Sequence, residues 1–249
     1  TGWYYGNKVY SADTSFTWSV ADALGTIDED GTFTAVQTGR DVTGTLTVTY
    51  GETSCTLSVT VGSSQPFDDT KGHWAESYIT ELYYAGTLQG SEKNGKLYYR
   101  PDASMTRQEF IVAMMRYLGT DLSAYASVQL PFDDSGSIAS WAKSAMQAAY
   151  QLGYLTGSKT NGKLLAKPGS TISRQEAMTI LSRTKDFADA DLNVLSAFSD
   201  SGKIADWART ALAQMTQQKI ISGSKGKLNP TGKVTRAEVA KMLYMLSES

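Results

Sequence analysis

Met105-Thr106-Arg107-Gln108-Glu109 is the stretch that organises most of the chain, because the sequence contains it three times. It returns as Ile172-Ser173-Arg174-Gln175-Glu176 and again as Val234-Thr235-Arg236-Ala237-Glu238. Each copy stands just ahead of apolar residues at helical spacing, for example Phe110, Ala113 and Met114. The three copies therefore predict three helices that begin in the same way.

Other short motifs recur in the same order around each copy. They are Phe67-Asp68-Asp69, Phe132-Asp133-Asp134 and Phe198-Ser199-Asp200; Trp74-Ala75, Trp141-Ala142 and Trp207-Ala208; Gly90-Ser91, Gly157-Ser158 and Gly223-Ser224; and Pro101, Pro168 and Pro230. Such self-similarity indicates a repeat architecture. In each repeat we expect a first helix that begins near the Trp and carries it on its apolar face, a Gly-Ser turn with a short extended piece, and a second helix. Because one helix pair cannot enclose a core, the three pairs should pack into one helical body.

The hydroxyl and the glutamate of each motif fit the helix-capping box, in which they satisfy backbone amides at the helix start. The predicted capping residues are Thr106, Glu109, Ser173, Glu176, Thr235 and Glu238. The arginine between them is different, since a cation at the first helical position meets the positive end of the helix dipole. Its recurrence indicates a partner for the guanidinium. Two partners fit equally well: an internal carboxylate, such as the Asp near each Trp, or an external anion.

Further repeated residues extend this candidate site. An exposed Trp face is a platform for a sugar ring, although a Trp that packs in the core fits the sequence as well. The serines follow glycines that permit close backbone approach, which is also ordinary turn chemistry. Two lysines would add positive charge, whereas the first repeat has Glu92 there. The candidate ligand-binding residues are Arg107, Arg174, Arg236, Trp74, Trp141, Trp207, Asp69, Asp134, Asp200, Ser91, Ser158, Ser224, Lys159 and Lys225.

The segment before the repeats has the alternation of β-strands. Leu46, Val48 and Tyr50 alternate with threonines, and the run that begins at Cys55 does the same, so Cys55 is expected to pack as a small buried hydrophobe. From Phe16 onward the segment resembles the bacterial Ig-like repeat of surface proteins, which implies a small β-sandwich that acts as a spacer. About five strands fit after Phe16, which predicts a module shortened at its start. Residues 1–15 supply either a first strand or a loose end.

Composition excludes several classes of function. The 249 residues include 23 basic and 25 acidic side chains, so no nucleic-acid partner or anionic membrane surface is expected. No apolar run has the length of a membrane helix, and no leader precedes the first strand, which indicates a mature protein or a fragment of a longer one. A single Cys and a single His (His73) exclude the usual zinc sites and most nucleophilic triads. We expect no cofactor and no metal.

The repeats together resemble three tandem S-layer homology units. The resemblance rests on Phe67-Asp68-Asp69, His73-Trp74-Ala75, Gly90, Pro101 and the motif at 105–109. Together with the Ig-like resemblance of the first segment, it predicts a multidomain chain: an Ig-like sandwich at 1–62, a linker at 63–66, and units at 67–130, 131–196 and 197–249. The family resemblance implies that these units form a mainly α-helical, pseudo-threefold prism. The third unit departs from the family pattern at Ser199 and Asp206.

The family resemblance also implies a function and a location. It implies a secreted, extracellular cell-surface protein held non-covalently to the cell wall or S-layer. The ligand it implies is secondary cell-wall polysaccharide carrying pyruvylated N-acetylmannosamine, bound in grooves between units. The alternatives are binding of modified peptidoglycan and a structural lattice subunit whose arginines pair internally. A glycan-active enzyme is least favoured, because adjacent carboxylates such as Asp68 and Asp69 do not face each other across a bond.

Overall fold

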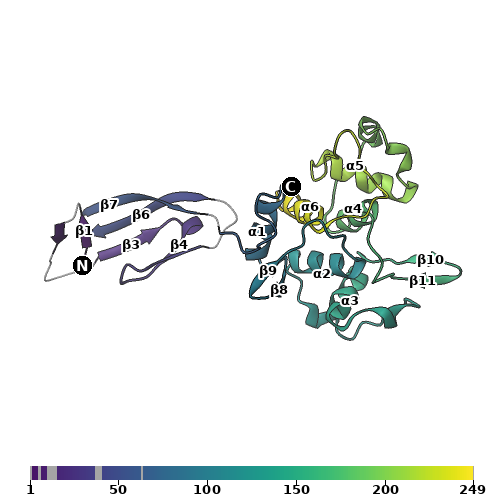
Figure 1. Ribbon diagram of the computed structural model, residues 1–249, viewed down its shortest axis with the longest axis horizontal. Helices are drawn as coiled ribbons and strands as arrows, with labels where there is room; N and C mark the ends of the chain where they lie inside the picture. The colour runs from purple at the N-terminus through teal and green to yellow at the C-terminus, as the bar shows by residue number, and fades with distance from the viewer. Residues whose placement is uncertain (1, 5–6, 10–15, 37–40, 63, 249) are drawn as a thin grey trace. The chain divides into compact units, whose positions relative to one another are not determined.

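The computed structural model describes residues 2–4, 7–9, 16–36, 41–62 and 64–248. The chain divides into two compact units, Thr1–Gln65 and Pro66–Ser249, and each is described by itself (Figure 1). In the linker predicted at 63–66, residue 63 lies outside the described part. The first unit contains strands and the second is mainly helical, as the change of period at this point predicts.

The first unit is built around an antiparallel sheet of three strands. Its order is β3 (Phe16–Val20), β6 (Val42–Tyr50) and β7 (Thr53–Val61). Two further pairs are β4 (Gly25–Ile27) with β5 (Phe33–Ala35), and β1 (Gly2–Tyr4) with β2 (Asn7–Val9); η1 is a short 3-10 turn at Asp22–Leu24. Alternating β-branched residues favour these strands because successive side chains point to opposite sheet faces.

The predicted burial of Cys55 is wrong, although the predicted alternation is right. Cys55 pairs with Val48 and Leu57 pairs with Leu46, so the apolar residues do share a face. Cys55 is nevertheless exposed, and Leu57 is 61% exposed. The fully buried Leu24 lies against Gly44, which pairs with Val59 near the far end of β7. That end of the edge strand is covered, and the Cys55 end is not.

The second unit repeats one pattern three times. The first copy has α1 (Glu76–Tyr84), β8 (Ser91–Lys93), β9 (Lys96–Tyr98) and α2 (Arg107–Tyr117); the second has α3 (Lys143–Gln151), β10 (Ser158–Thr160), β11 (Lys163–Leu165) and α4 (Arg174–Ser182); the third has α5 (Arg209–Gln217) and α6 (Arg236–Ser247). In the third copy a single bridge between Ser224 and Lys227 stands where the others have a hairpin. Short 3-10 turns connect these elements: η2 (Leu122–Tyr125), η3 (Ser135–Ser137), η4 (Ser140–Ala142), η5 (Leu192–Ala197), η6 (Ser201–Lys203) and η7 (Asp206–Ala208).

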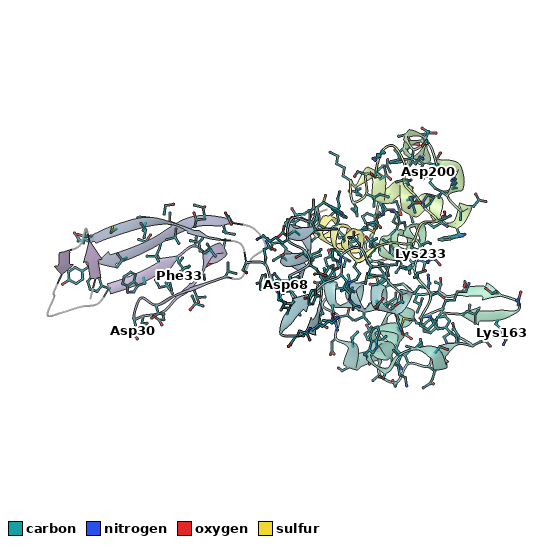
Figure 2. All side chains as sticks on the ribbon, viewed as in Figure 1. Asp30, Phe33, Asp68, Lys163, Asp200 and Lys233 are labelled. Carbon is teal, nitrogen blue, oxygen red and sulfur yellow. The ribbon has the colours of Figure 1, made fainter. Side chains whose placement is uncertain are left out.

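A cyclic set of backbone hydrogen bonds joins the three copies at the start of their motifs. The amide of Ile172 donates to the carbonyl of Met105 (3.0 Å), that of Val234 to Ile172 (3.0 Å), and that of Met105 to Val234 (3.1 Å). All three side chains are buried. Each copy therefore contacts both others, and one buried apolar cluster draws residues from all three copies. Figure 2 shows side chains filling the space between these helices.

Along the described residues, no helix combines the length and the apolar character needed to cross a membrane. In the same part of the chain, no three His, Cys, Asp or Glu side chains lie close enough together to hold a metal ion.

Candidate functional site

The second helix of each copy starts in a capping box. In the first, the Thr106 hydroxyl accepts from the Glu109 amide (3.3 Å), while the Thr106 amide donates to Glu109 Oε2 (2.8 Å). Ser173 with Glu176 and Thr235 with Glu238 repeat this arrangement. The cap engages one carboxylate oxygen of each glutamate. Oε1 remains available for another partner.

Oε1 of two of these glutamates accepts from the arginine of the preceding copy. Arg107 Nη1 lies 3.0 Å from Glu176 Oε1, and Arg174 Nη1 lies 2.8 Å from Glu238 Oε1. The Nε of each arginine donates to a carbonyl of that same neighbouring copy, at Ala166 for Arg107. Of the two partners that the sequence left open, an internal carboxylate is therefore present for both, but it is the capping glutamate and not the Asp.

Arg236, the arginine of the third copy, contacts the first copy without an ion pair to its capping glutamate. Its Nε donates to the carbonyl of Tyr99 (2.7 Å), and its Nη2 donates to the carbonyl of Gln89 (2.9 Å). The guanidinium carbon lies 4.4 Å from the centre of the Tyr99 ring, a cation–π arrangement. Burial raises the pKa of Tyr99 to about 12, although the charge of Arg236 opposes this shift. Among the described residues no ion pair joins Arg236 to Glu109.

The three aspartates hold the turn that presents a carbonyl to each arginine. Asp134 accepts from the amides of Ala166 (2.8 Å) and Lys167 (2.7 Å), one on each oxygen. Asp69 and Asp200 accept two consecutive amides in the same way. Lys167 has φ 52°, a left-handed conformation that a side chain rarely adopts, so these bonds stabilise a strained turn. Both oxygens of each Asp are thus engaged by the protein itself.

The tryptophans lie on the surface. Trp74, Trp141 and Trp207 are 56%, 57% and 57% exposed, so of the two roles left open by the sequence the packed core role is excluded. The prediction that each Trp shares the apolar face of the first helix is wrong. The α-helix begins two residues later in every copy, at Glu76 in the first, and the residues before it turn the ring outward.

The glycine of each Gly-Ser pair is required by a neighbouring ring. A Cβ on Gly157 would stand 2.6 Å from the Phe132 ring, and Gly90 and Gly223 face Phe67 and Phe198 in the same way. The Phe and Gly motifs therefore recur together because they pack against each other. The serines that follow are exposed, as are Lys159 and Lys225.

A cavity of about 340 Å³ gathers part of the predicted site from all three copies. Arg107 comes from the first copy, Ser158 and Glu176 from the second, and Trp207 from the third. The remaining lining residues are Thr156, Gly157, Thr179, Ile180 and Arg183. The lining includes none of the three aspartates and neither candidate lysine. The cavity is thus assembled across the copies and not within one of them.

Arg183 is the cavity residue that sequence reasoning missed. It follows the last residue of α4, and its Nη1 donates to the carbonyl of Tyr154 (2.8 Å) and to the hydroxyl of Thr156 (3.4 Å). Burial lowers its pKa, and the nearby charge of Arg107 lowers it further. Aligning the copies gives the signal that was available: Arg116, Arg183 and Met245 occupy one position after the three motifs.

Comparison with known proteins identifies the repeats. The family model described as "S-layer homology domain" matches residues 66–111, 131–178 and 197–240, which is more than half of the chain. An amylopullulanase of Thermoanaerobacterium thermosulfurigenes is 28% identical over 207 residues, covering 81% of this chain and 10% of that protein. Exoglucanase XynX of Acetivibrio thermocellus is 29% identical over 230 residues, covering 89% of this chain and 20% of the enzyme. The surface-layer 125 kDa protein of Lysinibacillus sphaericus is 27% identical over 192 residues, covering 73% and 15% of the two chains.

Proposed function

This chain belongs to the S-layer homology family, and from that premise we propose that it anchors a secreted surface protein non-covalently to the bacterial cell wall. Its ligand is an anionic, pyruvylated secondary cell-wall polysaccharide. The chain spans only 10% and 20% of the two enzymes it resembles, which fits an anchoring segment joined to a separate catalytic part. Similarity to a surface-layer protein supports a location at the cell surface.

The observation that carries the proposal is the cavity bordered by Arg107, Arg183 and the exposed Trp207. A guanidinium recognises a carboxylate through paired N–H donors, and an indole face provides an apolar wall for a sugar ring. A pyruvate ketal on a sugar presents both features in one residue. The exposed Ser158 supplies a hydroxyl at the same wall.

We also propose that the C-terminal unit is a pseudo-threefold prism and that the N-terminal unit is an Ig-like spacer. The cyclic hydrogen bonds among Met105, Ile172 and Val234 support the prism. The antiparallel β3–β6–β7 sheet supports the spacer.

Cell-wall sacculi provide the test of the anchoring function. Sacculi that retain their secondary polymer should pull the purified protein out of solution, and sacculi stripped of that polymer should not. Pyruvylated disaccharide should compete with this binding. Equal retention on both preparations would contradict the proposal and would favour peptidoglycan as the ligand.

A lattice subunit with internally paired arginines is the second candidate, and one observation favours it. Arg107, Arg174 and Arg236 all have their guanidinium groups engaged by the neighbouring copy. That engagement gives each arginine a structural role. The two candidate functions therefore differ in whether the cavity beside Arg107 binds an anion.

A further inference from the structure

The three contacts between copies have equivalent positions but different charges. We call them seams: seam 1–2 contains Arg107, Glu176 and Arg183; seam 2–3 contains Arg174, Glu238 and Met245; seam 3–1 contains Arg236, Glu109 and Arg116. Each seam also has the tryptophan of the remaining copy, as the equivalence of the repeats indicates: Trp207 in seam 1–2, Trp74 in seam 2–3 and Trp141 in seam 3–1. In seam 1–2 this placement is seen directly, because Trp207 lines the cavity with Arg107.

The cavity in seam 1–2 is lined by two guanidinium groups and one carboxylate. Arg107 and Arg183 face Glu176, which Arg107 already contacts at 3.0 Å. Asp134 also acts electrostatically on Arg107, but it does not line the cavity, and both of its oxygens accept backbone amides. The Nη1 of Arg183 donates to the Tyr154 carbonyl and the Thr156 hydroxyl, and its Nε and Nη2 donate to no other group among the described residues. Burial lowers the pKa of Arg183, and repulsion by the charge of Arg107 lowers it further. A single bound anion would relieve this repulsion.

The other two seams lack this combination. In seam 2–3 the position of Arg183 is taken by Met245, so this position adds no second guanidinium to the pair of Arg174 and Glu238. In seam 3–1 Arg116 is present, but the guanidinium of Arg236 is turned into the protein, with Nη2 on the Gln89 carbonyl and its face over Tyr99. Gln89 stands at the position that Thr156 holds in seam 1–2.

The geometry points to Arg183 as the residue that makes seam 1–2 the anion-binding site of the molecule, for a sugar bearing one carboxylate, while seams 2–3 and 3–1 hold the copies together. This inference rests on the proposed function. It adds which seam binds the ligand and which side chain recognises the ligand's carboxylate. The carboxylate lies between Arg183 and Arg107, and the sugar ring lies against Trp207. Glu176 keeps Arg107 in place and rejects a ligand with further negative charge.

The test compares two variants and two probes in the full chain. Arg183→Met gives seam 1–2 the side chain that the third copy already has, and Arg116→Met makes the same change in seam 3–1. The probes are the methyl glycoside of pyruvylated N-acetylmannosamine and its neutral counterpart, titrated by Trp fluorescence. Arg183→Met should weaken binding of the charged probe by about tenfold to a hundredfold, the usual effect of losing one charge-assisted hydrogen bond. It should leave the neutral probe unchanged, and Arg116→Met should change neither.

The outcomes separate this inference from the proposed function. Full binding of the charged probe by Arg183→Met, equal loss of both probes, or a loss in Arg116→Met instead would each overturn the assignment of Arg183. If the unaltered protein binds neither the charged probe nor polymer-bearing sacculi, the proposed function itself fails. Should Arg183→Met unfold, Arg183→Gln replaces it, because Gln retains N–H donors for a carbonyl such as that of Tyr154 but carries no charge.

Discussion

Three tryptophans with nearly equal exposure provide a matched test at the scale of single residues. Because Trp74, Trp141 and Trp207 lie outside the core, replacing each with Ala should cost little stability. Trp207→Ala should weaken retention on polymer-bearing sacculi by about tenfold, through loss of the apolar wall beside Arg107. Trp74→Ala should bind as the unaltered protein does. Similar losses in all three variants would indicate that the seams are equivalent.

Arg174→Ala should act on stability and not on binding. The substitution removes the 2.8 Å ion pair with Glu238 and the bond to the Leu228 carbonyl, both at a side chain that is 11% exposed. Loss of such charged hydrogen bonds destabilises a protein by about 2–3 kcal/mol, measurable by urea unfolding. Wall binding at a temperature where the variant is folded should be unchanged. A folded variant that no longer binds would place the anion in seam 2–3.

Asp200 should make stability depend on pH in the acid range. Burial raises its pKa, but hydrogen bonds from the backbone amides of Leu228 and Asn229 outweigh this and lower the pKa below the usual Asp value. The stabilisation is therefore complete above the unfolded pKa of about 4 and is lost as the pH falls through the folded value. Asp200→Asn should be less stable than the unaltered protein at pH 7, with a smaller difference at pH 3.

The control for this pH effect is the exposed Asp206. Asp206→Asn should follow the unaltered protein at both pH values in the same urea titrations. A difference for Asp200→Asn that stays constant from pH 7 to pH 3 would mean that the carboxylate charge is not what stabilises the turn.

At the scale of elements, the Gly-Ser turn before β10 should tolerate no side chain. Gly157 has φ 72°, and an added Cβ would meet the Phe132 ring at 2.6 Å. Gly153, at the end of α3, has φ 79° but nothing within 4 Å, so it serves as the matched control. Gly153→Ala should cost about 1–2 kcal/mol for the left-handed backbone alone. Gly157→Ala should cost about 1–3 kcal/mol more, from overpacking, when both are compared by urea unfolding.

Elements were predictable from sequence where their determinants are local. Thr106 and Glu109 are three residues apart and cap the helix that they start, so their spacing identifies the box directly. The partner of Arg107 is Glu176, in the next copy, and its choice depends on how the copies pack. Cys55 shows the same limit: alternation predicted its register with Val48, but burial needs a covering layer that the strand does not encode.

At the scale of the whole molecule, the cyclic hydrogen bonds predict that the three copies unfold together. Ile172→Ala should lower the free energy of unfolding by about 2–5 kcal/mol, because Ile172 is fully buried where the copies meet. Hydrogen exchange should then accelerate equally at the amides of Met105, Ile172 and Val234, which report the same global opening. Faster exchange confined to the second copy would show that the copies open independently.

At this scale the sequence predicted several residues of the site, but not which copies contribute them to one cavity. Repetition identified Arg107, Ser158 and Trp207 as members of recurring motifs, and all three line the cavity. Their grouping follows from the cyclic order of the copies, which places an arginine from the first beside a serine from the second and a tryptophan from the third. The spacing of residues within one repeat gives no information about the cyclic order of the copies.

The closed cycle also sets how many copies one such helical body holds. In each copy one backbone amide donates to one neighbouring copy, and one carbonyl accepts from the other. The carbonyl of the third copy accepts from the amide of the first, which closes the cycle. Loss of one copy by recombination would leave a donor and an acceptor unmatched inside the body, and a fourth copy would find no open position. Such a gain or loss leaves exposed pairing groups that favour exchange between chains. Residues such as Met245 and Ala237 differ from their counterparts in the other copies, whereas closing the body requires three copies.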